Sequence, residues 1–340
     1  MKKRTTIYDI ANKLQLTPST VSRALNNHSY ISEATKKVVR ETALEMNYKL
    51  NTQAHHLRTG GSKTIGVIVP KINLTFFSNV IAGIEAVANE HQYNIIICQS
   101  NDSFEKEVAC VNTLINQNVA CIMISLAANT KTNAHLIEIL NHQIELIQFD
   151  RIDDKIQTNK VFNHDDDVML DAVKHLLSQG YKTIAHLAGP QNIGIYKNRK
   201  DSFVKALQQH NLPINDAHII LDCYTKPEAF GLIRKLLTMP LRPDAIIASA
   251  DFMTLTVLEV ARSLNMLIPQ DLGIAGYSNE PYTELTTPTI TSVDQFSLNM
   301  GQTVATMFFQ EAKSDNKTNI PKSIIIYPKL IVRASTLRNF

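Results

Sequence analysis

The chain has 340 residues, 44% of them hydrophobic and 19% charged. These values are typical of a soluble globular protein with two or three folding units, and they exclude a disordered chain. The net charge of +3 is unevenly divided. Residues 1–63 hold 11 Lys and Arg against 4 Asp and Glu, whereas residues 64–340 hold 23 against 27. A head of charge +7 therefore precedes a body of charge −4, which favours nucleic acid or an anionic surface as a partner.

Membrane and export segments are not expected. No run of residues approaches the ~18 consecutive apolar positions of a membrane span. The basic start Met1-Lys2-Lys3-Arg4 is followed by polar residues rather than by the apolar core of a secretory signal, so we predict a cytoplasmic protein without a membrane partner. The cysteines have no Cys-x-x-Cys spacing, which predicts reduced, buried thiols rather than a metal site: Cys98, Cys110, Cys121 and Cys223.

Residues 6–26 have the pattern of two short helices joined by a tight turn. Thr6 can cap the first helix, and Thr17 can cap the second. Pro18 then occupies the first helical position, where no N–H is needed. A third helix is expected over 33–46, and its inner face would carry Val38, Val39 and Ala43.

Small polar side chains and an arginine face outward from the second predicted helix. Such a helix fits the major groove of DNA, where these groups reach phosphates and base edges. A three-helix bundle that merely packs on a partner is the alternative, and the charge of +7 favours DNA. The candidate DNA-binding residues, with Pro18, Ser19 and Arg23 as the expected sequence readers, are Thr6, Tyr8, Thr17, Pro18, Ser19, Thr20, Ser22, Arg23 and Asn26.

The segments Thr6-Ile7-Tyr8-Asp9-Ile10-Ala11 and Thr17-Pro18-Ser19-Thr20-Val21-Ser22-Arg23-Ala24-Leu25-Asn26 resemble the DNA-binding head of the LacI/GalR family of bacterial transcription regulators. The resemblance continues through Asn47-Tyr48 to Asn51. One departure is Gln15, because the family usually has a glycine in this turn. We expect Gln15 to take a left-handed conformation at some cost in strain.

The resemblance implies that residues 51–62 form the family's hinge helix, which orders on the operator. Leu57 matches the apolar wedge that enters the minor groove, and Ala54 would let two hinge helices approach. Without the family, Leu57 would be read as simple packing. The candidate hinge residues are Asn51, Ala54, His55, Leu57 and Arg58.

From residue 63 onward, short apolar runs alternate with amphipathic segments, which predicts α/β architecture with parallel sheets covered by helices on both faces. More than six strands suggest two such sheets beside a cleft, and the body resembles a periplasmic-binding-protein-like core. The expected domains are a helix-turn-helix domain, a hinge, and a core of two doubly wound subdomains. Their bounds are 1–50, 51–62 and 63–340, with an N-subdomain of about 63–162 plus 293–325 and a C-subdomain of about 163–292 plus 326–340.

No catalytic constellation is present. The sequence lacks the phosphate-binding glycine motifs, the H-E-x-x-H metal motif and the G-x-S-x-G nucleophile motif, so we expect neither an enzyme nor a cofactor. The cluster Asp165-Asp166-Asp167 could suggest a metal, but it directly precedes a helical run. Carboxylates are favourable at a helix N-terminus, and we interpret the cluster as helix capping.

The resemblance also implies an effector site, because several residues match positions that border the family's cleft. A carboxylate and an arginine can bind adjacent hydroxyls, while an aromatic ring stacks on a sugar or base. The residue-level alternatives are a core role for Phe77, an Asp150 paired only with Arg151, and a surface Arg199. The candidate effector residues are Phe76, Phe77, Asp150, Arg199, Tyr224, Asp251, Ser278 and Asn279.

Two departures concern specificity. Ala250-Asp251 stands where the family often has Asn-Asp, and Ser278-Asn279-Glu280 where it often has Asp-Asp after Gly-Tyr. No relative's effector can therefore be transferred. A sugar or sugar derivative is the expected ligand, with a nucleobase second.

The sequence thus predicts a DNA-binding transcriptional regulator, a repressor of a catabolic operon. It would bind a pseudo-palindromic operator as a homodimer and respond to a small metabolite. No heptad segment follows the last predicted strand, so no tetramer is expected. The rival from another class is a carbohydrate-binding protein or an enzyme on the same fold, with the head as an accessory.

Overall fold

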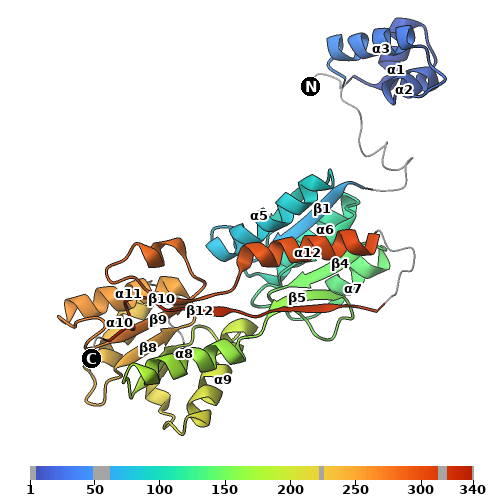
Figure 1. Ribbon diagram of the computed structural model, residues 1–340. Coiled ribbons are helices and arrows are strands. Elements are labelled where there is room, and N and C mark those ends of the chain that lie inside the picture. Colours follow the sequence, from blue (N-terminus) through green and yellow to red (C-terminus); the bar gives the residue numbers. More distant parts are fainter. Residues whose placement is uncertain (1–4, 49–61, 222–225, 313–319, 339–340) are drawn as a thin grey trace. The chain divides into compact units, whose positions relative to one another are not determined.

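The computed structural model describes residues 5–48, 62–221, 226–312 and 320–338 (Figure 1). Contacts within the chain divide it into two units, a head (1–62) and a core (63–340). Within the described ranges, no helix combines the length and the apolar character needed to cross a lipid bilayer.

The head contains three helices, α1 (Ile7–Leu14), α2 (Pro18–Leu25) and α3 (Glu33–Glu45). Both predicted caps are confirmed. The Thr6 hydroxyl accepts from the Asp9 N–H, and the Asp9 carboxylate accepts from the Thr6 N–H at 2.7 Å, which closes a capping box. The Thr17 hydroxyl accepts from the Thr20 N–H at 3.2 Å, and Pro18 occupies the first position of α2. The helix-turn-helix therefore forms from local hydrogen bonds that the sequence itself specifies.

Gln15 ends α1 in the left-handed conformation, with φ 51° and ψ 38°, as predicted from the missing glycine. The three helices enclose a small apolar core of Ile10, Ala11, Val21, Ala24, Val39 and Ala43. The expectation that Val38 faces inward is wrong, since its side chain is 48% exposed. Adjacent helical residues point about 100° apart, so burying Val39 turns Val38 toward solvent.

The core consists of two sheets, as predicted, and each sheet has six strands. The first sheet has the order β11-β5-β4-β3-β1-β2 and is entirely parallel. Its strands are β1 (Thr64–Val69), β2 (Asn94–Gln99), β3 (Cys121–Ile124), β4 (Glu145–Phe149), β5 (Asn159–Asn163) and β11 (Ser323–Ile326). Its helices are α5 (Thr75–Glu90), α6 (Phe104–Asn116), α7 (Ala134–Asn141) and α12 (Ser297–Ala312). We call this part the N lobe.

The second sheet has the order β12-β10-β9-β8-β6-β7, in which only β12 runs antiparallel, against β10. Its strands are β6 (Ile184–Leu187), β7 (Ile219–Ile220), β8 (Ala245–Ala248), β9 (Gly273–Tyr277), β10 (Thr291–Asp294) and β12 (Lys329–Ile331). Its helices are α8 (Asp166–Ser178), α9 (Gly194–Gln209), α10 (Lys226–Thr238) and α11 (Asp251–Ser263), with short 3-10 turns at Asp216–His218 and Pro281–Glu284. We call this part the C lobe.

Helices cover both faces of each sheet. In the N lobe, α5 and α12 pack on one face and α6 and α7 on the other. In the C lobe, α10 and α11 cover one face and α8 and α9 the other. The backbones of α5 and α12 approach so closely that a Cβ built on Gly301 would lie 2.0 Å from the carbonyl oxygen of Val80. Strands buried on both faces read as continuous apolar runs, which explains why they were visible in the sequence.

The chain passes between the lobes three times, after β5, after β10 and after β11. The strands β11 and β12, on either side of Pro328, therefore do not form a hairpin: β11 completes the sheet of the N lobe and β12 that of the C lobe (Figure 1). These crossings hold the carboxyl ends of both parallel sheets at the boundary between the lobes, where open α/β folds bind ligands.

Candidate functional site

Residues from both lobes line a small pocket of about 70 Å³ between them. It lies where β4, β8 and β9 end. Six of the eight predicted effector residues border it: Phe76, Phe77, Asp150, Arg199, Asp251 and Ser278. A wider cleft of about 1080 Å³ shares Asp150, Arg151 and Ile195 with this pocket. The structure thus brings together side chains that are up to about 200 positions apart in the sequence.

Arg199 on α9 is buried, with 3% of its surface exposed, so the alternative of a surface helix residue is excluded. Its Nε–H donates to a carboxylate oxygen of Asp165 at 3.2 Å, and its Nη1 donates to the carbonyl oxygen of Ser249 at 2.8 Å. The guanidinium carbon lies 3.6 Å from the ring centroid of Tyr277. Nη2 is buried without a hydrogen-bond partner among the described residues. An unpartnered buried donor is costly, and one that lines a pocket is suited to a ligand oxygen.

The interpretation of the acidic cluster as helix capping is wrong for Asp165. It stands at the N-cap position of α8, but its side chain makes no capping hydrogen bond. Its carboxylate instead pairs with Arg199 and accepts from the Tyr277 hydroxyl at 2.5 Å. Because Arg199 and Tyr277 come from α9 and β9, this arrangement depends on tertiary packing that no local pattern reveals.

Asp150 follows β4 and is held in the left-handed region, with φ 57°. The Ser125 hydroxyl donates to its carboxylate at 3.3 Å, and Arg151 Nε lies 4.0 Å from it. Burial raises the pKa of Asp150 to about 6, although the neighbouring Arg151 and Arg199 guanidinium groups act in the opposite direction. A backbone conformation that is costly for a non-glycine residue is often found at a functional site.

Asp251 begins α11 and is buried. Its carboxylate accepts from the Ser292 hydroxyl at 2.7 Å and from the Glu280 N–H at 2.8 Å. Burial raises its pKa to about 6. Gly276 is required beside it, because a Cβ at that position would lie 2.0 Å from Oδ1 of Asp251. The sequence Ala250-Asp251 therefore places a carboxylate in the pocket.

The two aromatic residues at the start of α5 are both largely buried, and their ring centroids lie 5.1 Å apart in an edge-to-face arrangement. Phe77 also belongs to the apolar core of the N lobe, so this residue both borders the pocket and packs in the core. Arg151 lies over the Phe77 ring, 5.7 Å from its centroid, and donates to Asp102 at 2.5 Å. The main partner of Arg151 is thus Asp102 rather than Asp150.

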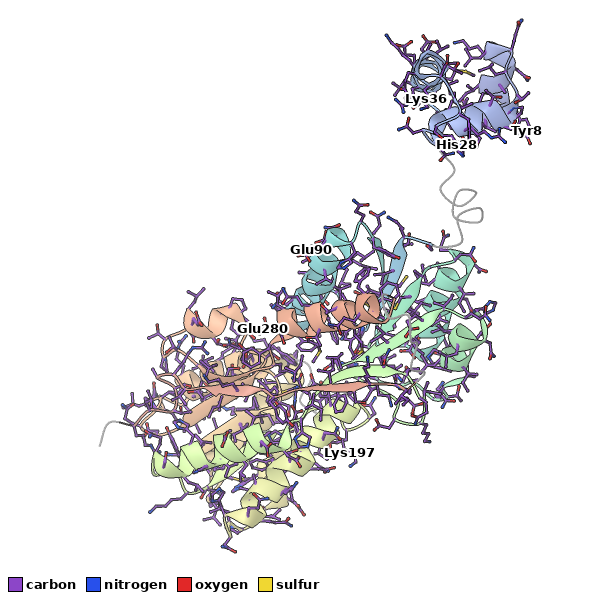
Figure 2. The ribbon with its side chains drawn as sticks, turned by 45° about the vertical axis from the view of Figure 1, so that its right-hand side comes forward. Tyr8, His28, Lys36, Glu90, Lys197 and Glu280 are labelled. Carbon is purple, nitrogen blue, oxygen red and sulfur yellow. The ribbon has the colours of Figure 1, made fainter. Side chains whose placement is uncertain are left out.

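Asn279 does not line the small pocket, contrary to prediction. Its amide donates to Asp294 at 3.1 Å, and its carbonyl accepts from Arg333 Nη2 at 2.8 Å. Glu280, the next residue, lines the pocket instead, and burial raises its pKa while the Thr75 hydroxyl lowers it. Figure 2 labels Glu280 in the C lobe. Tyr224 lies outside the described residues.

Among the polar residues at or next to this site, sequence reasoning missed Asp102, Glu280 and Gln295 and gave Arg151 no pocket role. A usable signal existed for two of them, since Arg151 follows Asp150 directly and Glu280 follows Ser278-Asn279. Asp102 and Gln295 gave none, because only the tertiary fold brings them near. Within the described ranges, no group of three or more His, Cys, Asp or Glu side chains could hold a metal ion.

The candidate DNA-binding residues lie on α1 and α2 and at the positions that cap these helices. Arg23 on α2 is exposed, as are Thr17 and Ser19, while Ser22 and Asn26 are half-buried. Tyr8 is 65% exposed and lies on the surface of the head (Figure 2). The candidate hinge residues Asn51, Ala54, His55, Leu57 and Arg58 all lie outside the described residues.

Known proteins match both parts of the chain. Residues 6–51 match the family model of bacterial regulatory proteins of the lacI family, and residues 173–336 match a periplasmic binding protein-like domain. Catabolite control protein A of Priestia megaterium is 30% identical over 327 residues, which cover 96% of this chain and 97% of that protein.

Two solved structures share the fold. The lac repressor dimer bound to operator and the anti-inducer ONPF matches with a TM-score of 0.84 at 22% identity, over 99% of this chain and 100% of that one. The complex of the transcriptional regulator CelR with cellobiose matches with a TM-score of 0.71 at 21% identity, over 98% and 100%.

The relationship to catabolite control protein A extends over nearly the whole length of both chains, and residues 6–51 of this chain match the lacI-family model. This relationship also separates the chain from the carbohydrate-binding and enzymatic alternatives on the same fold. The chain belongs to the lacI family of bacterial transcriptional regulators, with a helix-turn-helix head and a periplasmic-binding-protein-like core.

Proposed function

We propose that the protein binds a pseudo-palindromic operator as a homodimer and that a small metabolite in the pocket between the lobes controls this binding. Two heads held by a two-fold dimer would read two half-sites. The lac repressor structure is a dimer on its operator, which supports the same assembly here. The most similar relatives include a catabolite control protein and repressors, which favours a repressor of a catabolic operon.

The observation that carries the effector proposal is the unpartnered Nη2 of Arg199 at the small pocket. The guanidinium is already fixed by Asp165, Ser249 and Tyr277, so its free N–H groups are pre-oriented toward a ligand acceptor. Asp150 and Asp251 supply acceptors for ligand hydroxyl groups from the two lobes. A polyol that accepts from Arg199 and donates to these carboxylates would bridge the lobes.

The charge of the pocket favours a neutral ligand. Three carboxylates border it, those of Asp150, Asp251 and Glu280. Both arginines that border it are already paired with other carboxylates: Arg199 with Asp165, and Arg151 with Asp102. A phosphate group would therefore meet excess negative charge in a partly desolvated site, which is unfavourable.

An unphosphorylated sugar or sugar derivative is thus the proposed effector. Phe76 borders the pocket, where its ring suits the apolar face of a sugar, and the CelR structure contains cellobiose. A nucleobase is the second candidate, because its ring can stack on the same aromatic residue and its N–H groups can donate to a carboxylate.

DNA recognition is proposed for the exposed side of α2, with Pro18, Ser19 and Arg23 as sequence readers and Leu57 of the hinge as a minor-groove wedge. Effector binding would change the angle between the lobes and thereby the spacing of the two hinges. A coupling of ~1–3 kcal/mol between the sites would change operator affinity roughly 5–150-fold.

The test is genomic footprinting of the full-length protein, alone and with a panel of neutral sugars, their 6-phosphates and nucleosides. We expect enrichment of one palindromic site and a change in occupancy with a neutral sugar but not with its phosphate. Absence of an enriched palindrome would refute operator binding. A response to the phosphorylated sugars alone would refute the proposed ligand class while leaving operator binding intact.

A further inference from the structure

Two cysteines remote from the pocket form a pair. Cys98 lies on β2, the edge strand of the N-lobe sheet, and Cys110 lies on α6, which packs against that strand. Both border the same apolar cluster beneath α6 and α7. The Sγ of Cys110 lies 3.8 Å from the carbonyl oxygen of Gln99, the residue after Cys98. The expectation of buried thiols is wrong for both, since each is partly exposed, whereas Cys121 is fully buried.

The two thiols lie near each other and differ in acidity. The hydrogen bond from Cys110 lowers the pKa of Cys98 to about 7, and the same contact raises the pKa of Cys110. A thiolate is the nucleophile in thiol–disulfide exchange, so Cys98 is suited to attack and Cys110 to resolve the mixed disulfide.

The segment between the two cysteines is connected to the pocket. Asp102 lies in the turn that joins β2 to α6 and accepts from Arg151 Nη1 at 2.5 Å and from the Ala128 N–H at 3.1 Å. Arg151 lines the small pocket, and Ala128 lines the wider cleft. A covalent link between Cys98 and Cys110 would close a short loop around Asp102 and restrict the turn that holds Arg151 in place.

We propose that Cys98 and Cys110 are a redox pair that glutathione disulfide, or another small disulfide, oxidises to an intramolecular disulfide. The Cys98 thiolate attacks one sulfur of glutathione disulfide and releases one glutathione thiolate, which takes up the proton that Cys98 lost. The Cys110 thiol then loses its proton, attacks the sulfur of Cys98 and releases the second glutathione. Two protein thiols are oxidised and one glutathione disulfide is reduced to two glutathione molecules.

The test is to equilibrate the full-length protein with glutathione buffers of increasing oxidised fraction, block free thiols with N-ethylmaleimide, and map linked peptides by mass spectrometry. We expect a Cys98–Cys110 link within one chain, a mass loss of two hydrogen atoms, and full reversal by dithiothreitol. Amide hydrogen exchange of residues 99–104 should slow in the oxidised form, since the turn is then closed covalently.

Cys98→Ser and Cys110→Ser should each abolish the link. Cys121→Ala is the matched control, because Cys121 lies on the same sheet but is buried, and it should leave the link unchanged. The peptide map of the unmutated chain shows whether the Cys98–Cys110 link forms, even where a variant fails to fold. A stable mixed disulfide on Cys98 without the internal link, a link to Cys121 or Cys223, or a link between two chains would overturn the proposal.

Discussion

The guanidinium of Arg199 stacks on the ring of Tyr277, 3.6 Å from its centroid, while the hydroxyl of Tyr277 donates to the carboxylate that pairs with Arg199. Asp165 binds Nε of this guanidinium, the Ser249 carbonyl binds Nη1, and the Tyr277 ring covers its plane. These contacts hold the guanidinium in one orientation and leave Nη2 for a ligand. Pre-orientation of this kind lowers the entropic cost of binding.

Arg199→Lys is expected to weaken binding of the effector found in the panel by about tenfold or more, since lysine lacks the planar fork and the stack on Tyr277. Operator binding without effector should persist. Isothermal titration measures the dissociation constant. Lys205→Ala is the control, because Lys205 lies on the same helix but is exposed and pairs with Asp166. Equal loss in both variants would contradict the assignment of Arg199.

The buried carboxyl of Asp251 should make stability fall as pH rises. Its pKa is raised from 3.8 to about 6 in the folded protein, so folding favours the protonated form. The contribution of Asp251 to stability is therefore greatest below about pH 4, falls between about pH 4 and pH 6, and is lower by about 3 kcal/mol at neutral pH. The pKa of Asp150 is also raised to about 6, so its carboxyl affects stability in the same direction. Asp251→Asn should remove about half of the pH-dependent loss that the two carboxyls cause together, because Asp150 remains.

Urea unfolding at several pH values measures the Asp251 effect. Asp201→Asn is a control of opposite sign, because the hydrogen bond from Lys197 lowers the pKa of that surface carboxyl. Its small contribution is lost as pH falls, and the variant should leave the pH 4–6 decline in place. An unchanged decline in Asp251→Asn would contradict the prediction.

Arg23→Ala is expected to weaken binding to the enriched operator by about 1–3 kcal/mol and to have a much smaller effect on scrambled DNA, if Arg23 reads a base. Lys13→Ala is the comparison, since Lys13 is an exposed cation on α1 that pairs with Glu45 at 2.9 Å. Fluorescence anisotropy at several salt concentrations measures both. An equal loss on both DNAs would make Arg23 a phosphate contact instead.

Gln15→Gly should stabilise the head by about 1 kcal/mol, because glycine takes the left-handed conformation at φ 51° without the Cβ clash of glutamine. Amide hydrogen exchange of α1 and α2 in the full-length protein measures the change, and protection should rise several-fold. Asn12→Gly is the control, since Asn12 lies within α1 and glycine there should destabilise the helix. Reduced protection in Gln15→Gly would contradict the strain argument.

The head was predictable because its determinants are local. The caps at Thr6 and Thr17 are hydrogen bonds that span three residues, and Pro18 acts at its own position. The strands of the core were also visible, since burial on both faces of a parallel sheet leaves an apolar run in the sequence. Val38 was misplaced because adjacent apolar residues on a helix do not reveal which of them faces the core.

The pocket was predictable only in part. Resemblance and strand ends located Asp150 and Arg199, but the partner of Arg199 is Asp165, 34 positions away, which the sequence presented as a helix cap. In the same way, Asn279 forms hydrogen bonds with Arg333 and Asp294, whereas the next residue, Glu280, lines the pocket. Neighbours along a loop can face different partners, and local sequence does not specify which.

The sequence by itself determined a basic helix-turn-helix head, an α/β core and the family, because composition, periodicity and capping act over a few residues. Only the tertiary structure decided which charges neutralise one another at the pocket and which arginine nitrogen stays free. Those outcomes depend on long-range packing between strands and helices far apart in the chain. Ion pairing and pKa depend on distance and burial in three dimensions, which residue identity does not encode.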